Sequence, residues 1–294
     1  MIKSSELILN PNGTVFHLHL SPGQVADTII MVGDPERVDL VSRRFDRIET
    51  KVRNREFLTH TGYLQDIRIT VISTGIGTDN IDIVVNELDA LVNVDFGLRK
   101  PLVNLKSLNF IRLGTSGAVR PDIPVGSFVL SEKAIGFDGL LGFYEGLEEI
   151  SDIEFRKAFK EATHWRPEFP EPYVLNADKK LSDLFTDPDI IRGVTISSPG
   201  FYGPQGRIIR LPLADPDLNQ KIVDFRFGNH KVTNFEMESS AIYGLAGLLG
   251  HRAITLCAII ANRATGEFMG DYRELMQRFI AYSLNRLVEK REQL

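Results

Sequence analysis

TIIMVGDPERV, residues 28–38, decides the fold, because it reads as strand, turn and helix in immediate succession. Thr28–Val32 is apolar and partly β-branched, which favours a buried strand. Asp34 suits the N-cap of a helix and Pro35 its first position, so a helix is expected to begin at once. The stretch predicts a strand whose carboxyl end faces the N-terminus of a helix.

The same succession recurs along the chain. Ile67–Ser73 alternates apolar and polar residues, which predicts a half-buried strand, and Gly75-Ile76-Gly77 then precedes a helical apolar face from Ile81 to Leu91. Further strands are predicted at Asn109–Leu113, Val125–Leu130, Val194–Ser198 and Ala253–Ala261, the last buried on both faces, and further helices at Ser239–Leu249, ended by Gly250, and at Tyr272–Val288.

This alternation predicts an α/β protein with a central sheet and helices on both sides. No repeat, low-complexity tract or linker interrupts it, so residues 1–294 are expected to form a single domain. In such folds ligands bind outside the carboxyl ends of the strands. The loops that follow the strands are therefore where functional residues are expected.

The amino-acid composition excludes several classes of binding partner and location. The chain carries 34 Lys plus Arg against 39 Asp plus Glu, a net charge of -5, with no basic block, which argues against nucleic acid. The small-apolar run Ala253–Ala261 is too short to cross a membrane, and Met1–Asn10 lacks the apolar core of a secretory signal. Cys257 stands alone, so no intramolecular disulfide can form. We expect a soluble cytoplasmic protein.

Two glycine-containing segments could bind an anion. Gly33–Arg37 opens a helix, where free backbone N–H groups attract negative charge and Arg37 adds a cation, although turn chemistry explains everything except Arg37. Arg112–Gly117 places an arginine at a strand end before two glycines and two hydroxyls. It is not a phosphate-binding P-loop, because no Gly-Lys-Ser/Thr follows.

Two other segments could bind a sugar and a ring. Glu236-Met237-Glu238 begins an apolar helix, where acidic residues often only complement the helix dipole, but a carboxylate there could also accept from a vicinal diol. Phe201–Arg207 combines an aromatic platform with Gln205, which donates and accepts, and Arg207, which only donates. That pair complements a ring edge reading C=O, N–H, C=O.

The order of these motifs along the chain indicates a protein family, which no single motif does. GDPERV, NREF near residue 55, TGIG, RLGTSGA, FYGPQGR and FEMES, in this succession, resemble the nucleoside phosphorylase family over about Phe16 to Arg263. The resemblance is closest to the branch whose members cleave uridine. It implies a three-layer α/β/α fold with a mixed central sheet, a pentosyltransferase activity, and phosphorolysis of uridine to uracil and ribose 1-phosphate in nucleoside salvage.

The resemblance also implies site residues. His17 and Arg55 would reach in from a neighbouring subunit; His19, two residues on, would face the same way in an extended segment, so the choice of His17 rests on the Phe-His-Leu match. Arg112, Gln205 and Arg207 would be catalytic. The phosphate residues would be Gly33, Arg37, Arg55, Arg112 and Thr115; the ribose residues His17, Met237 and Glu238; and the base residues Thr115, Ser116, Gly117, Phe201, Gln205, Arg207, Glu236 and Arg263.

The implied chemistry needs no nucleophilic side chain, because phosphate attacks C1′. Gln205 would accept from N3–H and donate to O2 while Arg207 donates to O4, so these donors bind the leaving base most strongly in the transition state. Cytosine would set its amino group against Arg207. Purine-specific relatives carry an aspartate where this chain reads Ala261-Asn262-Arg263, which favours a pyrimidine.

Alternatives remain open. They are a purine nucleoside phosphorylase, a phosphate-independent nucleosidase, against which Arg37, Arg55 and Arg112 count, and a non-catalytic nucleoside-binding module. The resemblance does not decide between uridine, thymidine and deoxyuridine.

Assembly and ions are further expectations of the resemblance. It predicts a homo-oligomer with shared sites, either a dimer or a hexamer built as a trimer of dimers, that binds nucleoside and phosphate and needs no other cofactor. Some relatives bind potassium near the glutamate that Glu56 matches, but Asn80 replaces an expected serine, so a metal site is left open. The segments Val92–Leu105 and His164–Pro172 look like additions to the family pattern.

Overall fold

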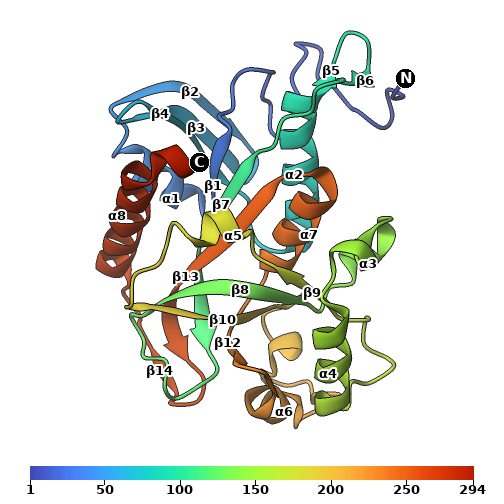
Figure 1. The fold of residues 1–294 in the computed structure, drawn as a ribbon, viewed down its shortest axis with the longest axis vertical. Helices are drawn as coiled ribbons and strands as arrows, with labels where there is room; N and C mark the ends of the chain where they lie inside the picture. Colours follow the sequence, from blue (N-terminus) through green and yellow to red (C-terminus); the bar gives the residue numbers. More distant parts are fainter.

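The computed structural model describes residues 1–294 (Figure 1). The strands are β1 (Thr28–Val32), β2 (Arg47–Asn54), β3 (Phe57–Leu64), β4 (Ile67–Ser73), β5 (Val94–Asp95), β6 (Lys100–Pro101), β7 (Asn109–Ala118), β8 (Phe128–Gly136), β9 (Tyr173–Asn176), β10 (Ile190–Ser197), β11 (Arg226–Phe227), β12 (His230–Glu236), β13 (Arg252–Asn262) and β14 (Glu267–Phe268). The α-helices are α1 (Pro35–Ser42), α2 (Thr78–Asn93), α3 (Leu147–Ile150), α4 (Ile153–Thr163), α5 (Lys179–Ser182), α6 (Leu218–Asp224), α7 (Ser239–Leu249) and α8 (Arg273–Glu289).

A 12-stranded sheet organises the molecule, with the order β11-β12-β10-β8-β13-β7-β1-β4-β3-β2 and with β14 and β9 attached to β13 and β8. β1 pairs in parallel with β4 and β7, and β7 in parallel with β13, whereas β3 pairs antiparallel with β2 and β4. β12 also returns to pair with β7, so β7, β13, β8, β10 and β12 close into a ring. The mixed sheet is confirmed; the ring was not foreseen.

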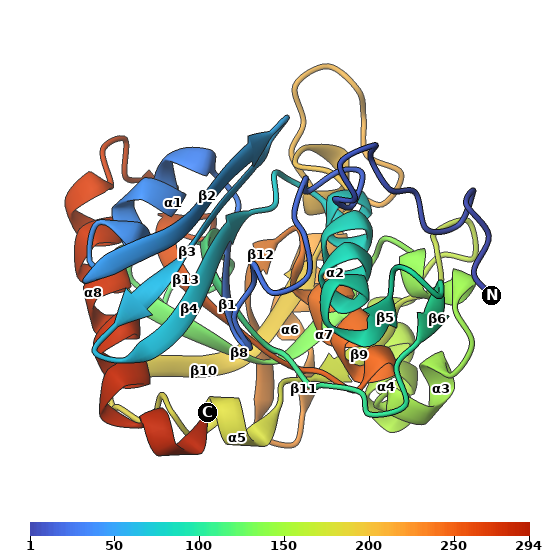
Figure 2. The ribbon, with the colours of Figure 1, turned by 90° about the horizontal axis from the view of Figure 1, so that it is seen from above.

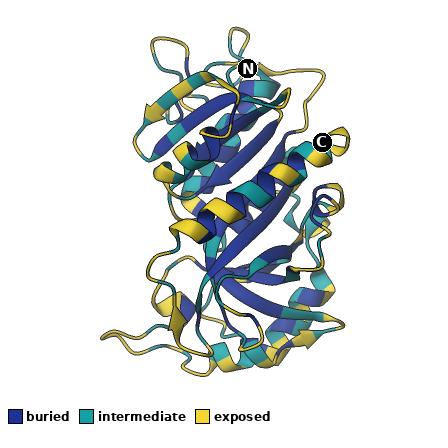
Figure 3. Ribbon diagram, turned by 90° about the vertical axis from the view of Figure 1, so that its left-hand side faces the viewer, coloured by how far each residue is buried: buried dark blue, intermediate teal, exposed yellow.

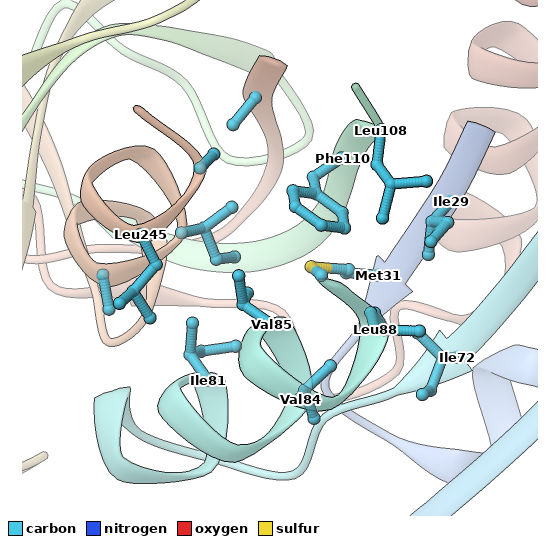
Figure 4. Packing of buried hydrophobic residues seen from close by; sticks show 14 of the residues in the cluster. Ile29, Met31, Ile72, Ile81, Val84, Val85, Leu88, Leu108, Phe110 and Leu245 are labelled. Atoms are coloured by element: carbon cyan, nitrogen blue, oxygen red, sulfur yellow. The ribbon is translucent and has the colours of Figure 1, made fainter. Parts of the chain in front are cut away.

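The first strand shows why helices cover both faces. Successive side chains of a strand point to opposite sides. Ile29 and Met31 pack with α2 and α7, while Ile30 and Val32 pack with α1 and α8. Figure 4 shows Met31 and Phe110 against Val85 and Leu88 of α2, and Figure 2 shows the layers from above. The three-layer α/β arrangement is thus confirmed.

Helix boundaries follow the local signals. The Asp34 side chain accepts a hydrogen bond from the Glu36 amide, and Pro35 occupies the first turn of α1, as expected. Gly250 ends α7 with a φ of 77°, which favours glycine. α8 spans nearly the predicted residues. These elements are set by side chains within a few positions of each end.

Three strand predictions need correction. β4 is buried over its last five residues rather than half-buried, because it lies between β1 and β3 under helices on both faces. β7 continues through Gly114–Gly117, predicted as a loop, because β13 pairs along its whole length. β8 begins at Phe128 instead of Val125, since Gly126 takes a left-handed φ of 92°.

The two additional segments have different roles. Within 92–105, β5 and β6 form a small two-stranded sheet. In 164–172, Trp165 packs on Phe137 with ring centroids 4.6 Å apart, and Arg166 donates to the Ala214 carbonyl at 2.7 Å. Figure 2 shows the segment between β10 and α6, in gold, projecting from the body of the molecule. The segment 164–172 therefore supports the base of that projection.

The distribution of buried and exposed residues agrees with the layered arrangement of sheet and helices. In Figure 3 the central strands are buried along most of their length, and exposed residues gather on helix surfaces and loops. Cys257 is among the buried residues. None of the helices combines the length and the apolar character that a membrane crossing requires.

Candidate active site

A cavity of about 880 Å³ opens where several strands end. Its walls come from the segments after β1, β4, β10 and β13, from β7, and from the junction of β12 with α7. This is the place where the sheet type predicts a ligand site. The cavity is large enough for a nucleoside together with a small anion.

Nearly all predicted site residues meet in this cavity. They come from five separate parts of the chain, which the pairing of β1 with β7 and the ring of strands bring together. The residues that line it are Gly33, Arg37, Arg112, Thr115, Ser116, Gly117, Phe201, Gln205, Arg207, Glu236, Met237, Glu238 and Arg263.

Two predicted residues, His17 and Arg55, do not line the cavity of their own chain. The His17 ring lies 2.7 Å from a Glu87 carboxylate oxygen, and Arg55 is exposed with a φ of 53°. The Asn54 amide donates to the His17 carbonyl at 2.7 Å, so the two segments are fixed to each other. The extended geometry assumed for His19 is wrong: residues 16–18 form a turn and His19 has a φ of 55°.

Arg112 is the central charge of the site. Its guanidinium bonds the Glu238 carboxylate and lies 3.4 Å from a Glu236 oxygen, and all three residues are buried. Burial opposes the charge of Arg112, but the Glu238 and Glu236 carboxylates outweigh it and raise its pKa. Arg112 Nη1 has no hydrogen-bond partner in the protein. The wall of the cavity thus contains a buried, permanently charged guanidinium with one donor nitrogen unpaired.

Arg37 adds a second cation at the same end. Its Nη1 lies 3.5 Å from the Leu113 carbonyl, and burial together with the neighbouring Arg112 lowers its pKa. Two arginines that repel one another in a buried pocket are stabilised by a bound anion. This end of the cavity is therefore suited to phosphate.

Glu236 has a different set of partners from the one the sequence suggested. Its oxygens accept from the Ser197 hydroxyl and from the backbone amides of Glu238 and Ser239. Burial and the nearby Glu238 raise its pKa, which Arg112 and Ser197 counteract. The Glu236 carboxylate therefore holds the start of α7 and Arg112 in position, and Glu238 remains the carboxylate nearer to the cavity.

Gly114 leaves room for Arg112. A Cβ at Gly114 would lie 1.7 Å from Arg112 Nη1 and 2.8 Å from its Cζ, which are the flexible end of that side chain. We expect Gly114→Ala to raise the KM for phosphate about tenfold and to lower the thermal unfolding midpoint, because the guanidinium must move away from its buried carboxylate partners Glu238 and Glu236. Ala258→Gly, on the paired strand, is the control for small-residue changes in this layer; an unchanged KM for phosphate in Gly114→Ala would contradict this geometry.

The other end of the cavity holds Gln205 and Arg207. Arg207 Nη1 donates to Gln205 Oε1 and to the Phe201 carbonyl, both at 2.6 Å, and its guanidinium lies 3.8 Å from the Phe201 ring centroid. Burial lowers the pKa of Arg207, and burial with Arg207 lowers that of Arg263 to about 10. The predicted aromatic platform, amide and guanidinium thus lie together, and the Gln205 oxygen accepts one hydrogen bond from Arg207.

Asn262 lies in the segment 261–263, where purine-specific relatives were expected to carry an aspartate. Its amide donates to the carbonyls of Arg120 and Ile123 at 2.8 Å, and its oxygen accepts from the amides of Ala264 and Thr265. All of its hydrogen-bonding capacity is therefore used to shape the turn after β13.

Asn262→Asp is expected to destabilise the fold by about 2 kcal/mol, because a carboxylate cannot donate to the two carbonyls. It should not create purine activity, since the side chain is held by the turn. Thermal unfolding and an inosine assay check both points, with Asn12→Asp as the control, because the exposed Asn12 side chain accepts from Thr14 and an aspartate can do the same. A stable variant that cleaves inosine would contradict this assignment.

Three further residues contribute to the cavity or support its walls and were not predicted from the sequence. The Gly77 amide donates to Glu238 at 2.8 Å, Asn234 donates to Ser116 Oγ at 3.0 Å, and Phe268 lines the cavity while 70% exposed. The glycines of the TGIG turn were a usable signal for Gly77. Asn234 and Phe268 had none, because their role depends on which strands meet.

Other features lie outside the site. A second hollow of about 560 Å³ lies behind the Phe201–Arg207 loop, has largely apolar walls, and contains only Arg207 of the predicted site residues. No group of three His, Cys, Asp or Glu side chains is arranged to hold a metal ion. Asn80 and Glu56 both lie against Gly75.

Comparisons with known proteins show the family of this chain. The family model for the phosphorylase superfamily matches residues 27–289. A uridine phosphorylase of Thermococcus kodakarensis is 32% identical over 90% of this chain and 83% of its own, and one of Haemophilus influenzae is 31% identical over 87% and 90%. The structure of a Trypanosoma brucei nucleoside phosphorylase, described as showing uridine phosphorylase activity, superposes with a TM-score of 0.87 at 30% identity, covering 96% of this chain and 99% of that one.

Proposed function

The chain belongs to the phosphorylase superfamily, and we propose that it catalyses the phosphorolysis of uridine to uracil and ribose 1-phosphate. The observation that carries the proposal is the order of groups along one cavity. Arg37 and Arg112 form a cationic end, Glu238 lies beside Arg112, and Gln205 with Arg207 forms a polar end against an aromatic ring. Phosphate, ribose and pyrimidine follow each other in the same order.

The phosphate end prepares the nucleophile. A dianion bound to Arg37 and Arg112, close to the helix N-terminus at Gly33, would be held in line with C1′ of the sugar. Glu238 would accept from the 2′- and 3′-hydroxyls once phosphate shares Arg112. Attack on an oxocarbenium-like C1′ from the side opposite the base gives ribose 1-phosphate with inversion.

The base end stabilises the leaving group. As the glycosidic bond breaks, negative charge grows on the ring oxygens, and donors aimed at these oxygens bind the transition state better than the ground state. Arg207 and the Gln205 amide supply such donors. The reaction uses no cofactor besides phosphate as co-substrate.

Two observations separate the alternatives. The segment after β13 supplies the Asn262 amide, held by the turn, instead of a carboxylate that could protonate a purine, which disfavours purine nucleoside phosphorolysis. The pair formed by buried Arg112 and half-buried Arg37 at the phosphate end has no use in a nucleosidase that employs water.

Incubation with uridine in the presence and absence of phosphate, followed by chromatography of uracil and ribose 1-phosphate, tests the proposal. Uracil release that does not depend on phosphate would refute a phosphorylase, and faster cleavage of inosine than of uridine would refute the pyrimidine assignment. Binding of uridine without turnover would indicate a binding module instead.

Shared sites are part of the proposal. Arg55 and His17 are tied together by Asn54 at the surface, and Arg55 is free of ion pairs, so a neighbouring copy of the chain can receive both. We propose a homo-oligomer in which these residues complete the partner's phosphate and ribose sites. A cytoplasmic location and a role in nucleoside salvage belong to the same proposal.

Subunit complementation tests the shared site. Arg55→Ala and Arg112→Met are each expected to lose most activity, and mixing them under conditions of subunit exchange should restore about a quarter of it in a dimer, because one of two sites in half of the dimers is then intact. Mixing Arg37→Ala with Arg112→Met is the control, since both residues lie in the same site. No recovery with Arg55→Ala, despite exchange, would contradict the shared site.

A further inference from the structure

The His17 side chain is held in one orientation by its own chain. Its ring packs edge-to-face with Phe16, with ring centroids 4.9 Å apart and an angle of 85° between the planes. The ring nitrogen Nδ1 lies 2.7 Å from a Glu87 carboxylate oxygen, and the His17 carbonyl accepts from the Asn54 amide at 2.7 Å. The side chain is 26% exposed. The ring is therefore fixed at the surface, and only its second nitrogen, Nε2, is left without a partner in the chain.

Glu87, on helix α2, divides its two carboxylate oxygens between the backbone and the ring. Oε2 accepts from the backbone amides of His17 at 3.1 Å and of Leu18 at 2.8 Å. Oε1 faces Nδ1 of the His17 ring at 2.7 Å and also accepts from the His17 amide at 3.0 Å. An ionised carboxylate only accepts hydrogen bonds, so Nδ1 carries a proton.

The proton on Nδ1 determines what Nε2 can do. In a neutral imidazole one nitrogen donates and the other accepts, so Nε2 of His17 is an acceptor. A carboxylate behind a functional histidine commonly sets the tautomer in this way. The ring thus presents one hydrogen-bond acceptor at the surface that a neighbouring copy of the chain is proposed to cover.

We propose that Glu87 is a positioning residue that fixes His17 as a hydrogen-bond acceptor, so that the shared site selects nucleosides whose 5′ substituent can donate. Glu87 does not itself touch the nucleoside. This role rests on the proposed function and on the shared site, which bring His17 to the ribose of a neighbouring copy.

The choice of substrate reveals the tautomer. A hydroxyl both donates and accepts, so uridine does not distinguish the two forms of the ring, whereas a 5′-ammonium group only donates. At about pH 7.5, kcat/KM for 5′-amino-5′-deoxyuridine should exceed that for 5′-deoxyuridine about tenfold in the wild-type protein. Equal kcat/KM for these two substrates would overturn the proposal.

Glu87→Gln should reverse the roles of the two ring nitrogens. The glutamine oxygen can accept from the amides of His17 and Leu18, and its NH₂ group then faces Nδ1, so the ring proton moves to Nε2 and opposes the ammonium. The preference for the 5′-amino substrate should fall at least about tenfold, whereas kcat/KM for uridine should fall at most about threefold. Parallel losses for all three nucleosides would indicate a merely structural role and overturn the proposal.

Two controls separate the tautomer from the charge of Glu87, because loss of a negative charge also weakens the binding of an ammonium. His17→Phe keeps an aromatic ring beside Phe16, and in this background Glu87→Gln should leave the ratio of the two substrates unchanged. Asp82→Asn removes a carboxylate of the same helix that accepts from Tyr144, and it should leave the wild-type preference intact. A fall in preference in either control equal to that in Glu87→Gln would overturn the proposal.

Nuclear magnetic resonance of protein with isotope-labelled histidine tests the same role without turnover. The chain has six histidines, and the spectrum of His17→Phe identifies the His17 signals. The neutral His17 ring should carry its proton on Nδ1 in the wild type and on Nε2 in Glu87→Gln; a proton on Nε2 in the wild type would overturn the proposal. The expected tautomers without phosphorolysis of uridine would refute only the proposed function, whereas turnover of uridine without the 5′ preference would refute only this role of Glu87.

Discussion

Replacing Arg112 by Met is expected to lower kcat/KM for uridine phosphorolysis by about 10²- to 10³-fold, because one buried cation serves both the phosphate and the orientation of Glu238. It should also destabilise the fold. Glu236 and Glu238 would share a buried site without their cation, and removal of one partner from a buried ion pair costs about 3–5 kcal/mol. Steady-state kinetics and chemical denaturation measure the two losses.

The stability loss in this variant has a defined dependence on pH. Burial already raises the pKa of Glu236, and without Arg112 that pKa rises further above its value in the unfolded chain, so the folded state binds more protons and gains stability as the pH falls. The penalty should therefore be smaller near pH 5 than near pH 8. Arg112→Lys, which keeps the charge, should regain stability more than activity; wild-type kcat/KM in Arg112→Met would refute the central role of this residue.

Replacing Arg207 by Met is expected to lower kcat for uridine by about 10²- to 10³-fold, since it removes a donor from the leaving base. The free energy of unfolding should change by only about 0.5 kcal/mol, because the side chain is half-buried and makes no ion pair. This separation of activity from stability distinguishes Arg207 from Arg112.

Arg210→Met is the matched control for Arg207. It lies three residues further along, is exposed, and changes the net charge by the same amount. Activity and stability should both stay near wild type. Unimpaired turnover of uridine by Arg207→Met would remove this residue from the base site, and a large stability loss would show that its bonds to Phe201 and Gln205 are chiefly structural.

The sequence by itself determined the elements and the residue types of the site. Helix α1 follows from Asp34 and Pro35, and the end of α7 from Gly250, because caps and turns depend on neighbours within one helical turn. The order of the glycine and arginine motifs likewise indicated the family and the thirteen predicted residues that line the cavity, since each motif carries its chemistry in adjacent positions.

Only the tertiary structure decided how these pieces meet. The return of β12 to β7 closes the ring and brings Asn234 behind Ser116, and the pairing of β7 with β13 turns a predicted loop into strand. Arg207 donates a hydrogen bond to Gln205 across the turn that follows β10. The Glu236 carboxylate accepts from the backbone amides at the start of α7 and lies beside Arg112. Such contacts join residues far apart in the chain or select one side-chain conformation among several, so local patterns could not specify them.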